Sequence, residues 1–310
     1  MSYNSQHSSL RTSGWTLYSA NLRSLNSEIL LGLLTKPKRS GFSPVGIRSC
    51  APLYNRSLLT ESQRDRIEIV LVAPRNPLNI GAVARAMANF GFTRLTVVAA
   101  YQPHWREARS AVGAPDLLQN ARETSTLAEA VADRTLVIGT GTLTRRKPEQ
   151  PVLLLPALPP IVAQELARGG RVALIFGPEK HGLTREDLSW CHTFVEIPTD
   201  TRQPSMNLGQ AVAVCLYEIA TRIAINESQA AGPPDPAATS GDLDILAGLI
   251  GEVMVAAGYS PQAMQSANRH AIRLMLRRLH LSSADQRRLL GLFRRILSSY
   301  RRYPNRNVAN

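Results

Sequence analysis

Cysteines and long apolar runs are scarce in this sequence, and each shortage excludes a class of protein. The only three cysteines, Cys50, Cys191 and Cys215, show no CxxC spacing, which argues against a disulfide framework or a zinc site and fits a reducing compartment. No run of 18 apolar residues occurs, so we expect no membrane-spanning segment. The sequence therefore predicts a cytoplasmic protein with neither a bound metal nor a membrane partner.

Acidic residues are also few relative to basic ones. The 310 residues include 36 lysines and arginines but only 23 aspartates and glutamates, which gives a formal net charge of +13 and a pI near 10.4. A surplus of this size is typical of proteins that bind a polyanion, most often nucleic acid. Composition alone does not distinguish RNA from DNA or from an anionic membrane surface.

Residues 1–63 form a basic segment that contains only two acids, Glu28 and Glu61. Its one apolar patch, residues 29–34, is too short and too far from the first residue for a usual secretory signal. The composition fits an organellar transit peptide, an RNA-binding arm or translation from an over-called start codon. We expect a mostly disordered extension, and an organellar location only if it is a transit peptide.

From residue 67 onward, strand-like runs alternate with helical stretches. The expected strands are rich in Val, Ile and Leu without strict alternation, as buried parallel strands are. They are 67–73, 95–99, 135–139, 172–176 and 194–197. The expected helices are 79–90, 126–132, 161–168 and about 207–226. This order predicts an α/β domain with a parallel sheet over residues 64–227.

A proline-rich linker is expected at 228–242, followed by a small all-helical module at 243–303. Residues 283–286 form a capping-box pattern that is expected to start the third helix of the module. Ten arginines but a single acid, Asp285, lie between residues 269 and 302. Because such like charges repel unless a partner neutralises them, we expect phosphate contacts that position RNA without reading its sequence. The candidates are Arg273, Arg277, Arg287 and Arg294.

The chain is organised around the stretch 79–91, which directly follows the first expected strand. Its pattern is Asn-x-Gly-x-x-Ala-Arg, and we expect Asn79 to cap the helix and Gly91 to end it in a left-handed conformation. Gly81 keeps the first turn bare, so that another backbone or a ligand can approach. Arg85 lies off the apolar face and is available to an anionic partner.

Two further stretches follow expected strands, at the edge of the sheet where α/β folds bind ligands. The first, 176–183, reads Phe-Gly-x-Glu-x-x-Gly-Leu, with Thr184 expected to cap the next helix. The second runs from Ile197-Pro198 to Ser-x-Asn-x-Gly-x-Ala-Val at 205–212. Neither contains a dinucleotide-binding glycine turn or a Walker lysine, so a dinucleotide or ATP site is not expected.

In this order, the three stretches resemble the motifs of the SpoU/TrmH branch of the SPOUT methyltransferases, over about half the chain. The Leu-x-Glu-Ala-Val sequence at 127–131 and the basic helical module extend the resemblance to those members that 2′-O-methylate tRNA at nucleotide 32 of the anticodon loop. The resemblance thus implies an enzyme with tRNA as its partner. The alternatives are a ribosomal RNA 2′-O-methyltransferase of the same family and an RNA-binding relative without catalysis.

The resemblance also implies a fold, a methyl donor and an assembly. The parallel sheet would contain a deep trefoil knot, and S-adenosylmethionine would lie among the knot loops of a homodimer whose sites are completed by the second subunit. The residues implied to contact the donor are Thr140, Gly141, Thr142, Gly177, Pro178, Ile197, Ser205, Met206 and Asn207.

Five residues match positions that the family uses in catalysis: Arg85, Asn79, Ser205, Asn207 and Glu179. A guanidinium stays protonated in proteins, so we expect Arg85 to clamp a phosphate and stabilise a developing alkoxide rather than act as a base. We expect Glu179 to shape its loop. His181 falls on an unspecified motif position, and we expect it to be exposed rather than catalytic.

Overall fold

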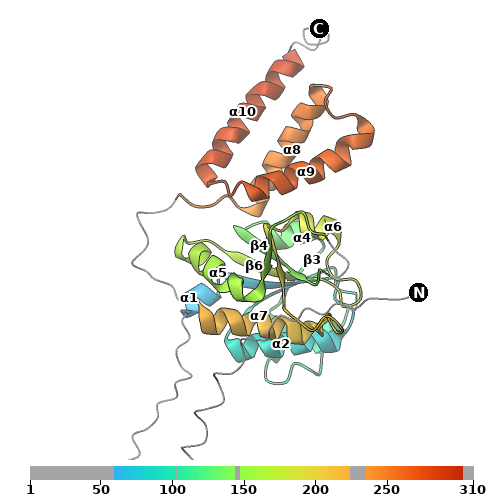
Figure 1. Ribbon diagram of the computed structural model, residues 1–310, viewed down its shortest axis with the longest axis vertical. Coiled ribbons are helices and arrows are strands. Elements are labelled where there is room, and N and C mark those ends of the chain that lie inside the picture. Colours follow the sequence, from blue (N-terminus) through green and yellow to red (C-terminus); the bar gives the residue numbers. More distant parts are fainter. Residues whose placement is uncertain (1–58, 102, 144–146, 224–234, 303–310) are drawn as a thin grey trace, which may run out of the picture. The chain divides into compact units, whose positions relative to one another are not determined.

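The computed structural model describes residues 59–101, 103–143, 147–223 and 235–302 (Figure 1). Most of the expected N-terminal extension and the first part of the expected linker lie outside these ranges. In the described part, α/β elements come first and three helices end the chain, as the sequence predicts.

The centre of the α/β part is a sheet of seven strands, all paired in parallel, in the order β3-β2-β1-β6-β4-β7-β5. The strands are β1 (Ile67–Val72), β2 (Arg94–Val98), β3 (Arg122–Thr124), β4 (Leu136–Gly141), β5 (Val152–Leu154), β6 (Val172–Phe176) and β7 (Thr193–Glu196). The predicted parallel α/β sheet is thereby confirmed, and the trefoil knot stays a prediction. The edge strands β3 and β5 were not predicted, because three residues are too few to show a pattern.

Both faces of the sheet are covered by helices, which explains why the strands do not alternate between apolar and polar residues. All six residues of β1 are buried. Ile69 and its neighbours on one face join the core that includes α2, α5 and α7, whereas Val70 faces the core of α4 and α6. The bounds are α2 (Pro77–Phe90), α4 (Leu127–Val131), α5 (Leu158–Ala167), α6 (Arg185–Ser189) and α7 (Leu208–Arg222); the short helices α1 (Glu61–Arg64) and α3 (Pro115–Gln119) complete this part.

The start of α2 differs from the expectation, and the difference matters for the site. Asn76, not Asn79, caps the helix: its side-chain oxygen accepts a hydrogen bond of 3.0 Å from the amide of Leu78, and Pro77 takes the first helical position. The end is as predicted, with Gly91 left-handed at a φ of 73°. Because Asn76 caps the helix, the side chain of Asn79 is available for contacts outside it.

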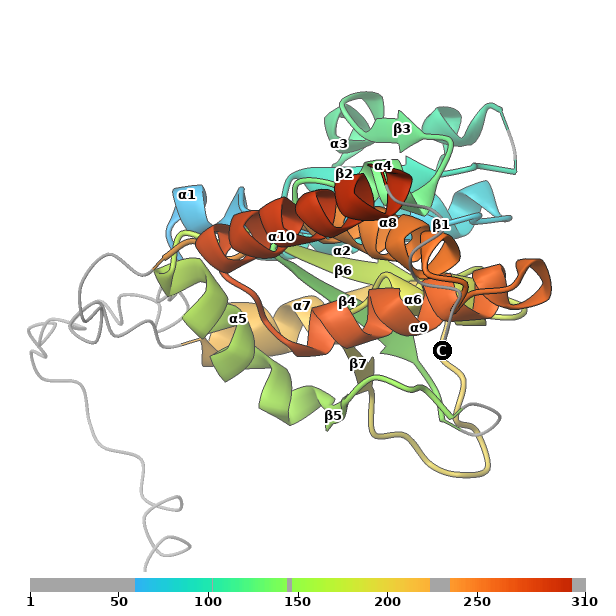
Figure 2. The same ribbon diagram turned by 90° about the horizontal axis from the view of Figure 1, so that it is seen from above.

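The last three helices, α8 (Ser240–Ala256), α9 (Gln265–Arg278) and α10 (Ser283–Arg302), form the predicted helical module (Figure 2). Its core includes Leu246 and Ile250 of α8 and Leu276 of α9. Thr239 caps α8, so the helix starts three residues before the expected boundary. The cap of α10 is also shifted by one residue, since Ser282 accepts the amide of Asp285 at 3.1 Å.

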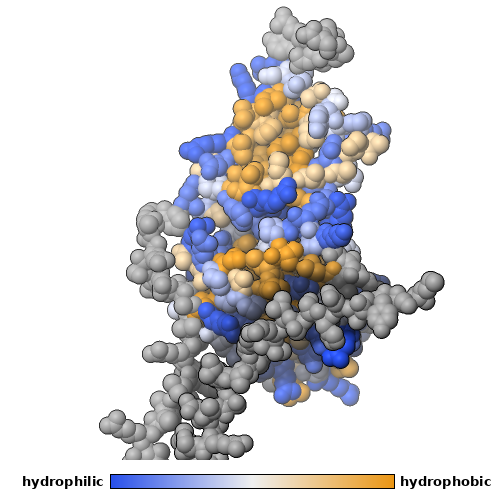
Figure 3. Space-filling model, viewed as in Figure 1, coloured by the Kyte–Doolittle hydropathy of each residue, from blue (hydrophilic) through white to orange (hydrophobic). Residues whose placement is uncertain are grey.

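Part of the module's surface stays apolar. Figure 3 shows apolar residues gathered over this part of the molecule, and Ile245 and Val255 of α8 and Leu292 of α10 are exposed. Within the described ranges, no helix is long and apolar enough to cross a membrane.

A buried histidine directly before β7 predicts an acid-sensitive fold. His192 accepts a hydrogen bond of 3.0 Å from the amide of Val137, and burial together with the charge of Arg277 and the nearby His280 lowers its pKa from 6.5 to about 3. The folded state keeps His192 neutral, whereas the unfolded chain protonates it below pH 6.5. The stability contributed by this neutral imidazole is therefore present above pH 6.5 and is lost as the pH falls toward 3.

We expect His192 alone to lower the free energy of unfolding by about 2 kcal/mol between pH 7 and pH 5. Urea titrations across this range should show a clearly flatter dependence for His192→Gln. The exposed His104 offers a matched control, since His104→Gln should retain the wild-type slope. Equal slopes for wild type and His192→Gln would contradict the assignment.

Candidate functional site

A cavity of about 560 Å³ lies beyond the carboxyl ends of β4, β6 and β7. This size falls within the usual range for a small-molecule site, and the strand ends are where parallel α/β sheets bind ligands. Of the nine residues predicted to contact the donor, eight line the cavity, and the ninth, Asn207, directly follows the lining residue Met206. The lining residues are Thr140, Gly141, Thr142, Phe176, Gly177, Pro178, Glu179, Lys180, His181, Gly182, Ile197, Pro204, Ser205, Met206, Leu208 and Ala211.

The loop between β6 and α6 forms a turn that only glycine allows. A Cβ atom on Gly177 would lie 2.2 Å from the backbone nitrogen of Leu183 and 2.3 Å from the carbonyl carbon of Gly182. The turn is closed by the amide of Gly182, which donates to the carbonyl of Pro178 at 2.7 Å, and Gly182 has a φ of 58°. Thr184 caps α6, as predicted. The backbone of this loop therefore forms one wall of the cavity.

The other walls are fixed by the end of β4 and the start of α7. The hydroxyl of Thr140 donates to the carbonyl of Ile175 at 2.9 Å, which joins β4 to β6 at the cavity. Asn207 caps α7 by accepting the amide of Gly209 at 2.9 Å. A Cβ atom on Gly209 would lie 2.7 Å from that of Ala82, so the first turn of α7 and the second turn of α2 are in close contact.

One asparagine connects the three sequence motifs. The amide nitrogen of Asn79 donates to Glu179 Oε1 at 2.8 Å, and its oxygen accepts a hydrogen bond of 2.9 Å from the side-chain nitrogen of Asn207. Asn79 thereby bridges the motif-two loop and the start of α7. This geometry fixes the orientation of its amide, since each end has a partner of only one kind.

Glu179 is ionised and committed to this network. It also accepts the backbone amides of Arg75 at 3.1 Å and Asn76 at 3.3 Å. Burial alone would raise its pKa, but the hydrogen bonds from Asn79 and the backbone amides outweigh it, and the pKa of Glu179 lies below its ordinary value. A carboxylate held by three donors is a poor proton acceptor, so its geometry suits shaping the loop.

Arg85 and Ser205 occupy different positions relative to the cavity. Ser205 lines it, whereas Arg85 is exposed on α2 and is not among the lining residues. Among the described residues, no hydrogen bond or ion pair engages the Arg85 guanidinium. The arginine of the first motif is thus available to a group outside this chain.

Sequence reasoning missed several lining residues. Lys180 and His181 belong to the motif-two loop, and both are exposed at the cavity. Their signal was their position between Glu179 and Gly182, inside a loop whose sequence already predicts that it binds a ligand. In the described ranges, no group of three His, Cys, Asp or Glu residues could hold a metal ion.

Of the four arginines predicted to contact RNA, two are exposed as expected and two are buried. Arg287 and Arg294 are exposed on α10. Arg273 and Arg277 are buried, with 7% and 0% exposure, and their nitrogens donate to acceptors inside the protein. The prediction was wrong for these two, because a buried guanidinium whose donors are occupied cannot reach a phosphate.

Comparison with known proteins matches most of the α/β part of the chain to a methylase family. The profile of the SpoU rRNA methylase family matches residues 66–217. A tRNA (cytidine/uridine-2′-O-)-methyltransferase TrmJ of Pectobacterium atrosepticum is 32% identical over 240 residues, which is 76% of this chain and 96% of the relative. The crystal structure of TrmJ from Z. mobilis superposes with a TM-score of 0.64 at 30% identity, and the alignment covers 74% of this chain and 98% of that one.

A second relative is more similar over a shorter stretch. A tRNA (cytidine/uridine/adenosine-2′-O-)-methyltransferase TrmJ of Pseudomonas aeruginosa is 42% identical over 156 residues. This match spans 50% of the present chain and 60% of the relative, less than two thirds of its length.

Proposed function

The chain belongs to the SpoU rRNA methylase family, and from this premise we propose that it transfers a methyl group from S-adenosylmethionine to a ribose 2′-hydroxyl of tRNA. The nucleotide we propose is number 32 of the anticodon loop. The observation that carries the proposal is the Asn79 bridge, which joins the three motifs at the edge of one cavity.

The cavity suits the proposed donor. Its walls combine backbone from the turn at Gly177 with the apolar side chains of Ile197, Met206 and Leu208. Such a lining can accept an adenine ring while backbone groups bind its edge. When bound, S-adenosylmethionine supplies a methyl group on a sulfonium, which is already activated and needs no metal.

The residues of the chain would then act by positioning and electrostatics. Asn79 and Glu179 fix the conformation of the motif-two loop, which would hold the donor. The Arg85 guanidinium would clamp the phosphate next to the target, where its positive charge would stabilise the charge that develops on the 2′-oxygen. This alignment of hydroxyl and methyl group replaces a bimolecular encounter by a prepared geometry.

We further propose that the working unit is a homodimer. Arg85 is exposed and does not line the cavity of its own chain. A second copy would bring its Arg85 to this cavity, in line with the family resemblance.

The extent of the similarity favours tRNA over ribosomal RNA. The match to the Pectobacterium relative covers 240 residues, whereas the family profile ends at residue 217, before the helical module. The relative that shares the longer stretch is named for tRNA. The family name refers to ribosomal RNA, so both substrates belong in the test.

The experiment is a competition between unmodified total tRNA and ribosomal RNA for labelled methyl transfer. We expect kcat/KM to favour tRNA by about a hundredfold or more, the ratio that recognition by several added contacts gives. Transfer to ribosomal RNA alone would show that ribosomal RNA, not tRNA, is the substrate, and would leave the proposed reaction class unchanged.

The exposed arginines of α10 are expected to grip phosphates. Replacing Arg287 and Arg294 together by glutamine should weaken tRNA binding and reduce the slope of log K against log salt by about 2, one unit for each lost phosphate contact. Filter binding at several salt concentrations measures both. Arg94→Gln, at an exposed arginine that starts β2, should leave the slope unchanged. A double variant with the wild-type slope would refute phosphate contact by these two residues.

A further inference from the structure

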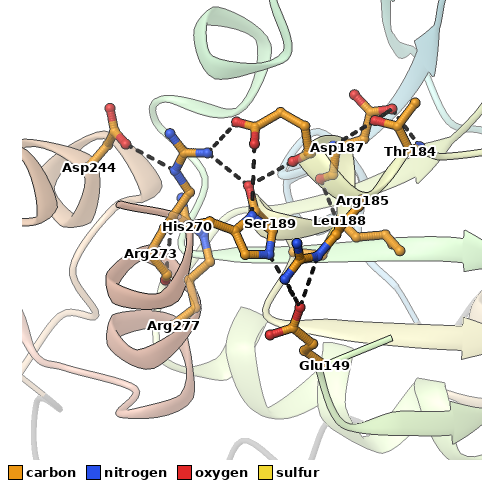
Figure 4. A network of polar contacts seen from close by, with 12 residues as sticks. Glu149, Thr184, Arg185, Asp187, Leu188, Ser189, Asp244, His270, Arg273 and Arg277 are labelled. Carbon is orange, nitrogen blue, oxygen red and sulfur yellow. Dashed lines mark hydrogen bonds and ion pairs between the residues drawn. The ribbon is translucent and has the colours of Figure 1, made fainter. Parts of the chain in front are cut away.

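Two buried arginines of α9 join the helical module to the α/β domain. Figure 4 shows their side chains between α9 and the segment around α6. Arg277 has no exposed surface; it donates from Nε to the carbonyl of Trp190 at 3.0 Å and from Nη2 to the hydroxyl of Ser240 at 2.8 Å. Its pKa is lowered to about 10, first by burial and then by the charge of Arg273, so it is still protonated at neutral pH.

Arg273 makes a second set of contacts to the same segment. Its Nη1 donates to Ser189 Oγ at 2.8 Å and to a carboxylate oxygen of Glu186, and its Nε pairs with Asp244 at 3.3 Å. The guanidinium also lies 4.1 Å from the ring centre of Trp190, and that of Arg277 lies 5.1 Å from it. We call Arg273, Arg277, Glu186, Ser189, Trp190, Ser240 and Asp244 the arginine latch.

The start of α8 is a second point of attachment. The amides of Ser240 and Gly241 donate to the carbonyls of Arg134 and Ala132, each at 2.8 Å. A Cβ atom on Gly241 would lie 2.9 Å from the Ala132 oxygen, so glycine permits this approach. Because Ser240 also accepts Arg277, the two attachments form one continuous contact.

The latch holds the segment that closely follows one wall of the donor cavity along the chain. Gly182 lines the cavity, and α6 begins three residues later, at Arg185. Leu183 and Leu188 belong to the core on the face of the sheet that α4 and α6 cover. The segment around α6 is therefore packed against the sheet and is not a free loop. The module is thus attached within a few residues of the cavity.

We propose that Arg273 and Arg277 are positioning residues: they hold the helical module, with the exposed arginines of α10, in a fixed place relative to the donor cavity. The tRNA-binding part of this inference rests on the proposed function. Its physical reason is that a docked module presents its phosphate contacts already ordered, whereas a tethered one loses freedom at each binding event. Three of the acceptors in the latch, on Ser189, Trp190 and Ser240, are buried, so removing an arginine leaves a buried acceptor unpaired and favours undocking.

The test compares Arg277→Met with Arg278→Met, which changes the exposed neighbouring arginine on the same helix. Docking is read from the quenching of Trp190 fluorescence by acrylamide, with Trp190→Phe to identify its signal. We expect quenching to increase in Arg277→Met only. We also expect tRNA affinity, measured by filter binding without the donor, to fall about tenfold more than in Arg278→Met, with the Kd for S-adenosylmethionine and kcat at saturating tRNA within about twofold of wild type.

A second pair of variants covers the case in which Arg277→Met fails to fold. Arg273→Gln should show the same two changes, and Arg273→Lys should restore part of both, because it keeps a cation over Trp190 and a donor for Ser189. Weaker tRNA binding without increased quenching, or increased quenching with unchanged tRNA binding, would overturn the inference. Both readouts are independent of methyl transfer, so an inactive wild type would overturn the proposed function alone.

Discussion

Replacing Arg85 by alanine is expected to lower kcat by about a hundredfold to a thousandfold, the loss typical when one charged donor at a developing oxyanion is removed. The reason is that Arg85 is exposed, carries no internal ion pair among the described residues, and occupies the arginine position of the first motif. The Kd for S-adenosylmethionine should not change, since Arg85 does not line the cavity. Single-turnover methyl transfer and calorimetric donor binding measure the two quantities.

The control is Arg94→Ala, which removes another exposed arginine of the same domain. It should retain wild-type kcat. If Arg85→Ala kept full turnover, the electrostatic mechanism would be wrong. If Arg85→Ala lost donor binding together with turnover, the loss would report misfolding rather than chemistry.

Replacing Gly177 by alanine is expected to abolish donor binding, with the Kd raised at least about a hundredfold. The added Cβ would lie 2.2 Å from the backbone nitrogen of Leu183, and a backbone atom cannot move aside as a flexible side chain can. The turn from Pro178 to Gly182 must then open, and it forms one wall of the cavity. Equilibrium dialysis with labelled donor gives the Kd directly.

A matched glycine for comparison lies in α10. Gly291 has nothing within 4 Å of an added Cβ, so Gly291→Ala should leave donor binding unchanged and stabilise the helix by about 1 kcal/mol. Wild-type donor affinity in Gly177→Ala would show that the motif-two turn is not the donor site.

The variants Arg85→Ala and Gly177→Ala together also test the proposed homodimer. If a second copy supplies Arg85, mixing Arg85→Ala with Gly177→Ala should restore about a quarter of wild-type activity, because half of randomly paired dimers are hybrids and each hybrid has one intact site of two. No recovery after exchange of subunits would argue that each chain completes its own site.

The sequence predicts the elements of the α/β domain well, for a physical reason. Parallel strands buried on both faces are nearly continuous apolar runs that few other structures require: β6 is wholly apolar, and β1 is interrupted only by Glu68. The glycine at position 91 also has a single plausible role, and its left-handed backbone was predicted. By contrast, the order of the strands depends on contacts between distant segments, and the place of β6 between β1 and β4 could not be derived from local patterns.

The site was predicted in part. Eight of the nine residues that the resemblance implied to contact the donor line one cavity, because these motif residues follow the carboxyl ends of parallel strands. The role of Asn79 was misread, since Asn76 and Asn79 are both good capping residues and only the position of Pro77 distinguishes them. Arg273 and Arg277 were misassigned because burial of a charged side chain depends on acceptors far away in sequence, such as Trp190 and Ser240.

The most direct test of the account is methyl transfer from labelled S-adenosylmethionine to unmodified tRNA, with the product nucleosides resolved and the modified position mapped. We predict a single 2′-O-methylated pyrimidine nucleoside at position 32 of the anticodon loop. A methyl group on a base, or donor binding without transfer to any RNA, would contradict the proposed reaction.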